Sequence, residues 1–210
     1  MPSRLEKARK DPNSMKARIL ASARKIFGEY GYNDTTTRMI AGDVGIDIST
    51  LYYHWGEKQD LYEAVLMEIS EEIQKELSAV EKKVSGQSLA TRLELAIDMM
   101  SDYLFSHPEV SNLILFGYFN KTRHGVTLDI SMSKYISNIA FAMGLSKNRE
   151  TVSTEAKARI LAVWNTVLNF ISGENFFRPL LDTNREEYIR VVKETLNFIL
   201  VPAFTAETGS

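Results

Sequence analysis

Three neighbouring side chains that bind anions well stand where a short helix is expected to begin. They are Thr36, Thr37 and Arg38, and Thr36 can act as the N-cap of a helix over residues 37–44. The backbone N–H groups of a helix N-terminus point toward an anion, and the helix dipole favours negative charge there. Hydroxyl and guanidinium groups at this place are suited to holding a phosphate of a nucleic-acid backbone.

Catalytic chemistry has little support in the sequence. The 210-residue chain contains no cysteine, which excludes disulfides, thiolate metal sites and cysteine nucleophiles. It has no phosphate-binding loop, no His-Glu-x-x-His pair and no Gly-x-Ser-x-Gly motif. Glu68, Glu71 and Glu72 lie on one expected helix without a partnering histidine, which argues against a di-metal bundle. We therefore expect no catalytic residue, no metal ion and no cofactor; an enzyme or a purely structural helical adaptor without DNA binding is the rival interpretation.

Apolar residues at helical spacing run through most of the chain and predict an all-α protein of about nine helices. In the first helix, Ile19, Ala23 and Phe27 form one stripe, and Gly31 is a natural stop. No strand pattern competes seriously. The expected helices cover residues 14–30, 37–44, 48–54, 58–84, 88–106, 109–120, 126–143, 151–172 and 185–200.

The segment from 37 to 55 has the spacing of two helices that cross at a tight turn. Ala41 permits a close approach of the helices, and Gly45 can adopt the left-handed conformation of the turn. Asp47 can cap the second helix. The expected small core comprises Ile40, Val44, Ile46 and Leu51.

This segment resembles the N-terminal domain of the TetR family of transcriptional regulators. The resemblance covers residues 14–66 closely and extends to the rest of the chain only as a helix count. The matching motifs, in order and at matching spacing, are Gly31-Tyr32, Thr35-Thr36-Thr37, Ile40-Ala41, Gly45-Ile46, Leu51-Tyr52-Tyr53-His54 and Lys58-x-x-Leu61.

The resemblance implies which residues contact DNA. Ile48 and Ser49 open the recognition helix, where Ile48 can touch a thymine methyl group and Ser49 can bond a base edge. Tyr52, Tyr53 and Lys58 correspond to residues that contact phosphates in the family. With the three residues at the start of the preceding helix, the expected DNA-binding set is Thr36, Thr37, Arg38, Ile48, Ser49, Tyr52, Tyr53 and Lys58. The chain departs from the family pattern at Met39 and Asp47, where an acidic residue and a serine or threonine are commoner.

Charge is unevenly distributed at the N-terminus. Residues 1–25 contain eight basic and two acidic side chains, although the whole chain has a formal net charge of −2. A basic arm there would add sequence-independent affinity for DNA, and a merely solvated arm is the alternative. His54 is interpreted as a residue packed between helices rather than a titrating switch.

Two domains are expected: a helix-turn-helix DNA-binding domain over residues 1–60 and an effector-binding and dimerisation domain over 61–210. The last helix carries apolar residues on two faces and so needs two partners. A second subunit is the simplest supplier, and the resemblance implies a homodimer in which the last two helices pair with their copies. The expected interface comprises Ile160, Val167, Ile171, Ile189, Val192, Leu196 and Ile199.

The resemblance also implies a small-molecule effector in the C-terminal domain. Aromatic rings, methionines and amides suit a pocket for an apolar or amphipathic molecule, although any protein core uses the same residue types. The candidate ligand-binding residues are Met99, Met100, Tyr103, Phe116, Phe119, Asn120, Trp164 and Asn165. The implied function is that of a repressor released from a palindromic operator by this molecule. Because no secretory signal or membrane span is visible, we expect a cytoplasmic protein without a membrane partner.

Overall fold

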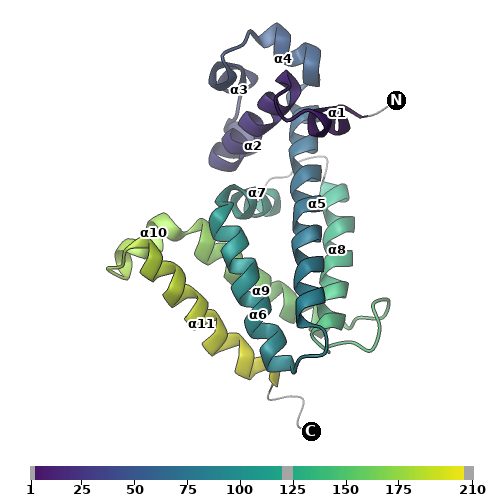
Figure 1. Ribbon diagram of the computed structural model, residues 1–210, viewed down its shortest axis with the longest axis vertical. Helices are drawn as coiled ribbons and strands as arrows, with labels where there is room; N and C mark the ends of the chain where they lie inside the picture. Colours follow the sequence, from purple (N-terminus) through teal and green to yellow (C-terminus); the bar gives the residue numbers. More distant parts are fainter. Residues whose placement is uncertain (1–2, 120–124, 206–210) are drawn as a thin grey trace. The chain divides into compact units, whose positions relative to one another are not determined.

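A computed structural model describes the backbone of residues 3–119 and 125–205, and the side chains of these residues except 119–132. Within those ranges every regular element is an α-helix (Figure 1), which confirms the predicted all-α class. The helices are α1 (Arg4–Lys10), α2 (Met15–Asp34), α3 (Thr37–Val44), α4 (Ile48–Trp55), α5 (Lys58–Val84), α6 (Leu89–Ser106), α7 (Pro108–Phe119), α8 (Gly125–Ala142), α9 (Thr154–Ser172), α10 (Glu174–Leu180) and α11 (Arg185–Thr205).

Two of these helices, α1 and α10, were not among the nine predicted. A capping box stabilises the start of α1: the Ser3 hydroxyl accepts from the Glu6 N–H (3.1 Å), and the Ser3 N–H donates to the Glu6 carboxylate (2.6 Å). Leu5 and Ala8 are buried on its inner side. The basic N-terminal segment is therefore a packed helix, and the prediction of an arm was wrong in this respect.

The chain divides into two compact units. The first comprises Met1–Glu72 and Asn112–Lys121, and the second Ile73–Ser111 and Thr122–Ser210. The first unit extends beyond the predicted boundary at residue 60 because the first half of α5 packs within it. The Tyr62 ring lies edge-on to Phe27, with 4.9 Å between ring centroids.

The core of the first unit forms where α2, α3 and α4 meet. Its fully buried side chains include Ile19, Phe27, Ile40, Leu51 and Trp55. The second half of α7 also belongs to this unit. Asn112 Nδ2 donates to the Gly28 carbonyl (3.0 Å).

Gly31 ends the regular part of α2, as predicted, with φ 72° and ψ 178°. This backbone conformation is open to almost no residue except glycine. A Cβ atom at Gly31 would also lie 3.4 Å from the Phe116 ring of α7. Both the conformation and the close packing explain the glycine.

In the second unit, α11 packs along α6 (Figure 1). One stripe of α11 is buried, comprising Tyr188, Val192, Leu196, Leu200 and Phe204. The Lys193 ammonium lies between Asp98 (2.7 Å) and Asp102 (2.5 Å) of α6. Across the described helices, none combines the length and the apolar character that a bilayer span requires.

Candidate nucleic-acid interface

The two helices α3 and α4 and the turn between them have the predicted geometry. Thr36 Oγ1 accepts a hydrogen bond from the Met39 N–H (3.2 Å), which confirms Thr36 as the N-cap of α3. Gly45 is left-handed (φ 76°, ψ 41°), and the Ile46 N–H after it donates to the Ala41 carbonyl (2.9 Å). These bonds close the turn and fix where α4 begins.

Asp47 occupies the N-cap position of α4, but its side chain accepts no capping hydrogen bond. Asp47 is thus the N-cap residue of α4 as predicted, but no hydrogen bond of its carboxylate stabilises the helix start. The backbone of Asp47 has the extended conformation that an N-cap residue requires. Its exposed carboxylate is a negative charge beside the start of the recognition helix.

The expected DNA-contacting side chains lie mostly on the outside. Tyr53 is 83% exposed and Tyr52 40% exposed, which is unusual for rings of this size. Thr36, Arg38 and Ser49 are exposed, while Thr37 and Ile48 are half-buried. The exposed edges of α3 and α4 thus offer hydroxyl, guanidinium and aromatic groups to a partner.

Lys58 is placed differently from the other residues of this set. Its Nζ donates to the carbonyls of Tyr32 (2.8 Å) and Thr35 (2.9 Å), and it lies 4.2 Å from the centre of the Tyr32 ring. Burial lowers the pKa of the Lys58 ammonium. A phosphate at Lys58 would have to compete with these two carbonyls, so the geometry favours a structural link between α5 and the end of α2.

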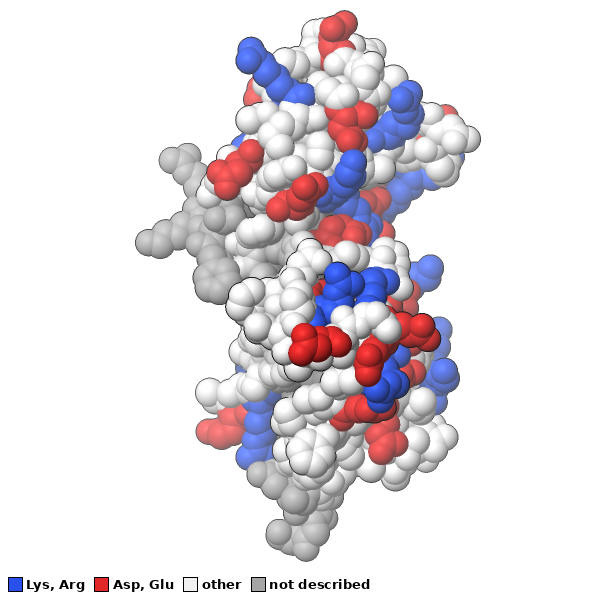
Figure 2. Space-filling model, turned by 90° about the vertical axis from the view of Figure 1, so that its left-hand side faces the viewer, with Lys and Arg blue, Asp and Glu red and all other residues white. Residues whose placement is uncertain are grey.

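Most cations near the N-terminus also bind the chain itself. Lys25 pairs with Asp43 (2.9 Å), and the Arg18 guanidinium donates to the Val44 carbonyl (3.1 Å). Arg24 pairs with Glu72 (2.7 Å) of α5. On the face drawn in Figure 2, basic and acidic side chains are interspersed. The excess positive charge of residues 1–25 is thus used largely to hold the first unit together.

His54 is half-buried near the end of α4, and its Nδ1 atom is buried without a hydrogen-bond partner. Burial and, to a lesser extent, the nearby Lys16 charge lower the pKa of His54. The Tyr53 ring lies edge-on to it, 5.2 Å away. This environment agrees with the interpretation of His54 as a packed, neutral residue.

Four of the candidate ligand-binding residues gather in the second unit. Met99, Met100, Tyr103 and Trp164 belong to one apolar cluster with Val80 and Val84 of α5. The Trp164 Nε1–H is buried without a hydrogen-bond partner. This cluster therefore combines apolar side chains with one buried donor.

The remaining ligand candidates are not brought to this cluster by the described structure. Phe116 packs against Gly31 in the first unit. Asn165 Nδ2 donates to the Leu161 carbonyl of its own helix (2.8 Å). The side chain of Phe119 and the whole of Asn120 lie outside the described residues.

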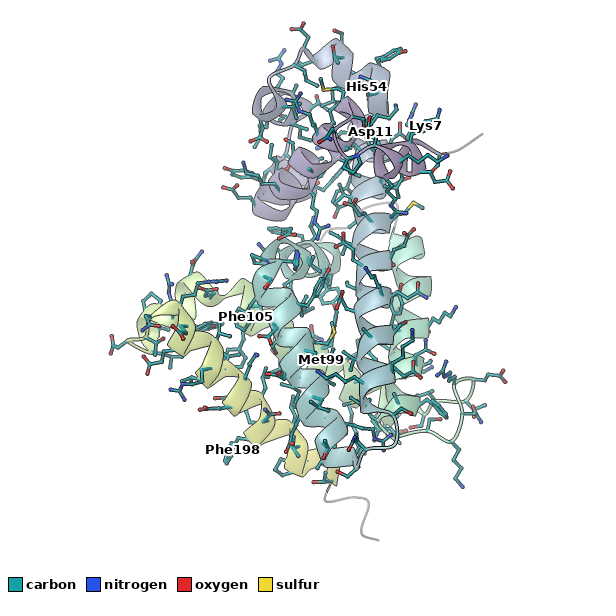
Figure 3. All side chains as sticks on the ribbon, in the orientation of Figure 1. Lys7, Asp11, His54, Met99, Phe105 and Phe198 are labelled. Carbon is teal, nitrogen blue, oxygen red and sulfur yellow. The ribbon has the colours of Figure 1, made fainter. Side chains whose placement is uncertain are left out.

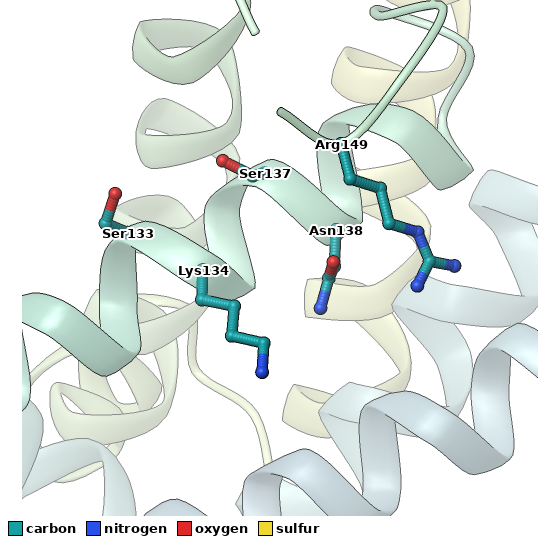
Figure 4. A pocket seen from close by; sticks show the side chains of 5 residues that line it. All are labelled: Ser133, Lys134, Ser137, Asn138 and Arg149. Carbon is teal, nitrogen blue, oxygen red and sulfur yellow. The ribbon is translucent and has the colours of Figure 1, made fainter. Parts of the chain in front are cut away.

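A cavity of about 550 Å³ opens beside α8 (Figure 4). Its lining is polar and comprises Ser133, Lys134, Ser137, Asn138 and Arg149. Arg149 is already paired with Glu81 (2.6 Å). The sequence analysis did not single out these residues, because hydroxyl and amide groups one helical turn apart also occur on any solvated helix face.

The expected dimer interface needs correction. Ile160, Val167, Ile171, Val192 and Leu196 are buried within the protomer itself. They fill the chain's own core and offer no surface to a partner. Ile189 is half-buried, and only Ile199 of the predicted set is exposed. The large apolar side chains that are exposed on α10, α11 and the turn between them are instead Phe176, Leu180, Leu181, Phe198 and Ile199.

Comparison with known proteins gives matches of two kinds. The family described as "Bacterial regulatory proteins, tetR family" matches residues 19–65. The HTH-type transcriptional dual regulator CecR of Shigella flexneri is 47% identical over 47 residues, which are 22% of this chain and 21% of that protein. The probable HTH-type transcriptional regulator YttP of Bacillus subtilis (strain 168) is 28% identical over 102 residues, 48% of this chain and 49% of that protein. The matched part of the chain thus spans between about a fifth and a half of the length of these curated relatives.

Solved structures extend the likeness to the whole fold. The crystal structure of AibR in complex with isovaleryl coenzyme A and operator DNA superposes with a TM-score of 0.63, covering 88% of this chain and 95% of that one. The sequences are 17% identical, so this comparison concerns the fold alone. The N-terminal match concerns sequence, and the whole-chain match concerns architecture.

Proposed function

We propose that the protein is a homodimeric repressor that binds a palindromic operator and is released by a small molecule. The proposal starts from its membership of the TetR family of bacterial regulatory proteins, whose family model matches residues 19–65. The observation that carries the DNA-binding part is the exposed edge of α3 and α4. Tyr53 is 83% exposed on the helix that the resemblance assigns to the major groove. The ring and the hydroxyl of Tyr53 are therefore accessible to a DNA partner.

The homodimer part of the proposal is supported by a second set of exposed apolar side chains. Five large apolar side chains on α10, α11 and the turn between them are exposed, and we call them together the α10–α11 apolar face: Phe176, Leu180, Leu181, Phe198 and Ile199. Figure 3 shows Phe198 projecting from the outer side of α11. Several large exposed apolar side chains on two successive helices favour an interface with another protein chain. Pairing of this face with its copy gives two recognition helices, which read two half-sites about 34–36 Å apart.

The effector is proposed to bind at the cluster around Trp164, near Met99 (Figure 3). A ligand with an apolar body and one hydrogen-bond acceptor would satisfy the unpartnered Trp164 Nε1–H. The likeness to AibR, whose structure contains isovaleryl coenzyme A, supports an acyl thioester as the first compound to test. Both α5 and α7 contribute residues to the two compact units, so a shift of either helix can carry the signal.

The DNA-binding part is tested by selecting bound duplexes from random DNA with the purified protein. We expect enrichment of one near-palindromic motif. Replacing Tyr53 by Ala should weaken binding to this motif about 5-fold, the value of one lost hydrogen bond. The matched control is Tyr30→Ala, an exposed tyrosine of α2 that hydrogen-bonds Glu29 and lies outside the expected set. An equal loss in the two variants, or no enriched motif, would contradict the proposal.

The effector part is tested by adding isovaleryl coenzyme A to the complex with the selected duplex. We expect the wild type to lose affinity for DNA and Trp164→Phe, which lacks the N–H donor, to respond at higher ligand concentration. An unchanged affinity of the wild type would contradict the acyl-thioester class. An identical response of the two proteins would contradict the site at Trp164.

A further inference from the structure

Residues that precede the family match bind the C-terminal end of α4. We call Arg4 and Lys16, with their hydrogen bonds to α4, the clasp. The match begins at residue 19, whereas α1 and the start of α2 precede it. The Arg4 Nη1 atom donates to the Trp55 carbonyl (2.7 Å), and Lys16 Nζ donates to the His54 carbonyl (2.7 Å). In return, the Trp55 indole Nε1–H donates to the Lys16 carbonyl (3.0 Å).

These bonds satisfy groups that a helix leaves open. The last carbonyls of α4 have no partner within the helix and carry the negative end of its dipole. Arg4 and Lys16 place two positive charges on two of those carbonyls. Burial lowers the pKa of Lys16, and the charges of Lys7 and Arg4 add to this, which is consistent with cations concentrated at one point.

The same clasp reaches the first turn of α5. Arg4 also pairs with Asp60 (3.3 Å), and the Asp60 carboxylate accepts from the Glu57 N–H (3.0 Å). Gly56 links α4 and α5 with φ 83°. A Cβ atom there would collide with the Asp60 carboxylate and lie 2.8 Å from Arg4 Nη1. Arg4 therefore packs directly against the joint that sets the direction of α4 relative to α5.

We propose that Arg4 and Lys16 are positioning residues for DNA recognition, which hold the C-terminal end of α4 in place without touching phosphates themselves. The inference rests on the proposed function and deepens it, since it gives α1 a role in holding the recognition helix. Lys7 (Figure 3) and Lys10 are exposed on α1. Within the described residues, no hydrogen bond or ion pair joins either of them to α4. They provide matched controls on the same helix.

The experiment compares Arg4→Gln, Lys16→Gln and the double variant with the control Lys10→Gln in the full-length protein. We expect each single variant to weaken binding to the selected duplex about 2- to 5-fold and the double variant about 5- to 30-fold, as for lost charges at a helix C-terminus. The slope of log affinity against log salt concentration should stay that of the wild type, whereas loss of a phosphate contact would reduce it by about 0.9. Circular dichroism at the assay temperature checks that all variants are fully folded.

Hydrogen–deuterium exchange of the protein without DNA provides a second readout. The amides at the end of α4 include the Gly56 N–H, which is bonded to the Tyr52 carbonyl (2.8 Å). They should exchange faster in Arg4→Gln than in the wild type, and at the wild-type rate in Lys10→Gln. A reduced salt slope in Arg4→Gln would overturn the inference by making Arg4 a phosphate contact. Equal exchange and equal affinity in Arg4→Gln and Lys10→Gln would also overturn it. If the wild type bound no duplex, the proposed function would fail, and the exchange data would still decide whether the clasp orders α4.

Discussion

Replacing Phe198 by Glu tests the α10–α11 apolar face as the surface that joins two protomers. Phe198 is 81% exposed in the single chain, so the substitution removes almost no packing within the protomer. A buried phenylalanine removes roughly 150–250 Å² from water. At about 25 cal/mol per Å², covering the exposed four-fifths of the ring contributes at most about 3–5 kcal/mol in each copy.

Part of that contribution is offset by the ordering of side chains on association. A centrally placed aromatic residue still typically costs about 2 kcal/mol or more when it is removed from an interface. We therefore expect Phe198→Glu to raise the dimer dissociation constant by at least about 30-fold, since 1.4 kcal/mol corresponds to a factor of 10.

Sedimentation velocity over a series of protein concentrations measures this constant directly. Met67→Glu is the matched control, because Met67 is also an exposed apolar residue, on α5. The control should remain a dimer. If Phe198→Glu associated as strongly as the wild type, the α10–α11 apolar face would not be the dimer interface, and the reasoning from exposure would be refuted.

Three further predictions concern the stability of the first unit. Leu51→Ala removes a fully buried side chain of α4 and should lower the free energy of unfolding by about 2–5 kcal/mol in urea denaturation; a loss below about 1 kcal/mol would show that Leu51 is not in the core. Gly31→Ala should cost about 1–3 kcal/mol, because its backbone conformation suits only glycine, and a variant as stable as the wild type in the same assay would contradict this. The pKa of His54 is lowered in the folded protein, so the unfolded chain takes up a proton first as the pH falls, and stability should decline below about pH 6.5. Thermal unfolding measured at pH 7.5 and 5.5 should show a smaller decline for His54→Asn than for the wild type. An identical decline in both proteins would exclude His54 as its source.

The helix-turn-helix could be predicted from the sequence because its signals are local. Thr36 and Gly45 act on backbone groups within a few residues, through a cap and a left-handed turn. Such effects depend little on the rest of the fold. Asp47 shows the limit, since its type suits the N-cap position but its carboxylate makes no capping bond.

Contacts between distant segments were less predictable. Both faces of α11 carry apolar residues at helical spacing. Periodicity alone therefore does not say which face the protomer buries. The structure buries Val192 and Leu196 and leaves Phe198 exposed. Lys58 was assigned to a phosphate by its motif, but its long side chain reaches the carbonyls at the end of α2. The Ser3-x-x-Glu6 capping box could have identified α1, whereas its bonds to α4 depend on the tertiary fold.

The central claim is that two copies of the exposed α3–α4 edge bind one operator. Hydroxyl-radical footprinting of the selected duplex tests it most directly, because it maps the protected sugars on both strands. The proposed dimer predicts two protected patches on one face of the DNA, with centres about 34–36 Å apart. With Tyr53→Ala, both patches should need about 5-fold more protein for half-protection. A single patch, or protection that spreads evenly along the duplex and needs the same protein concentration with Tyr53→Ala as with the wild type, would contradict the account.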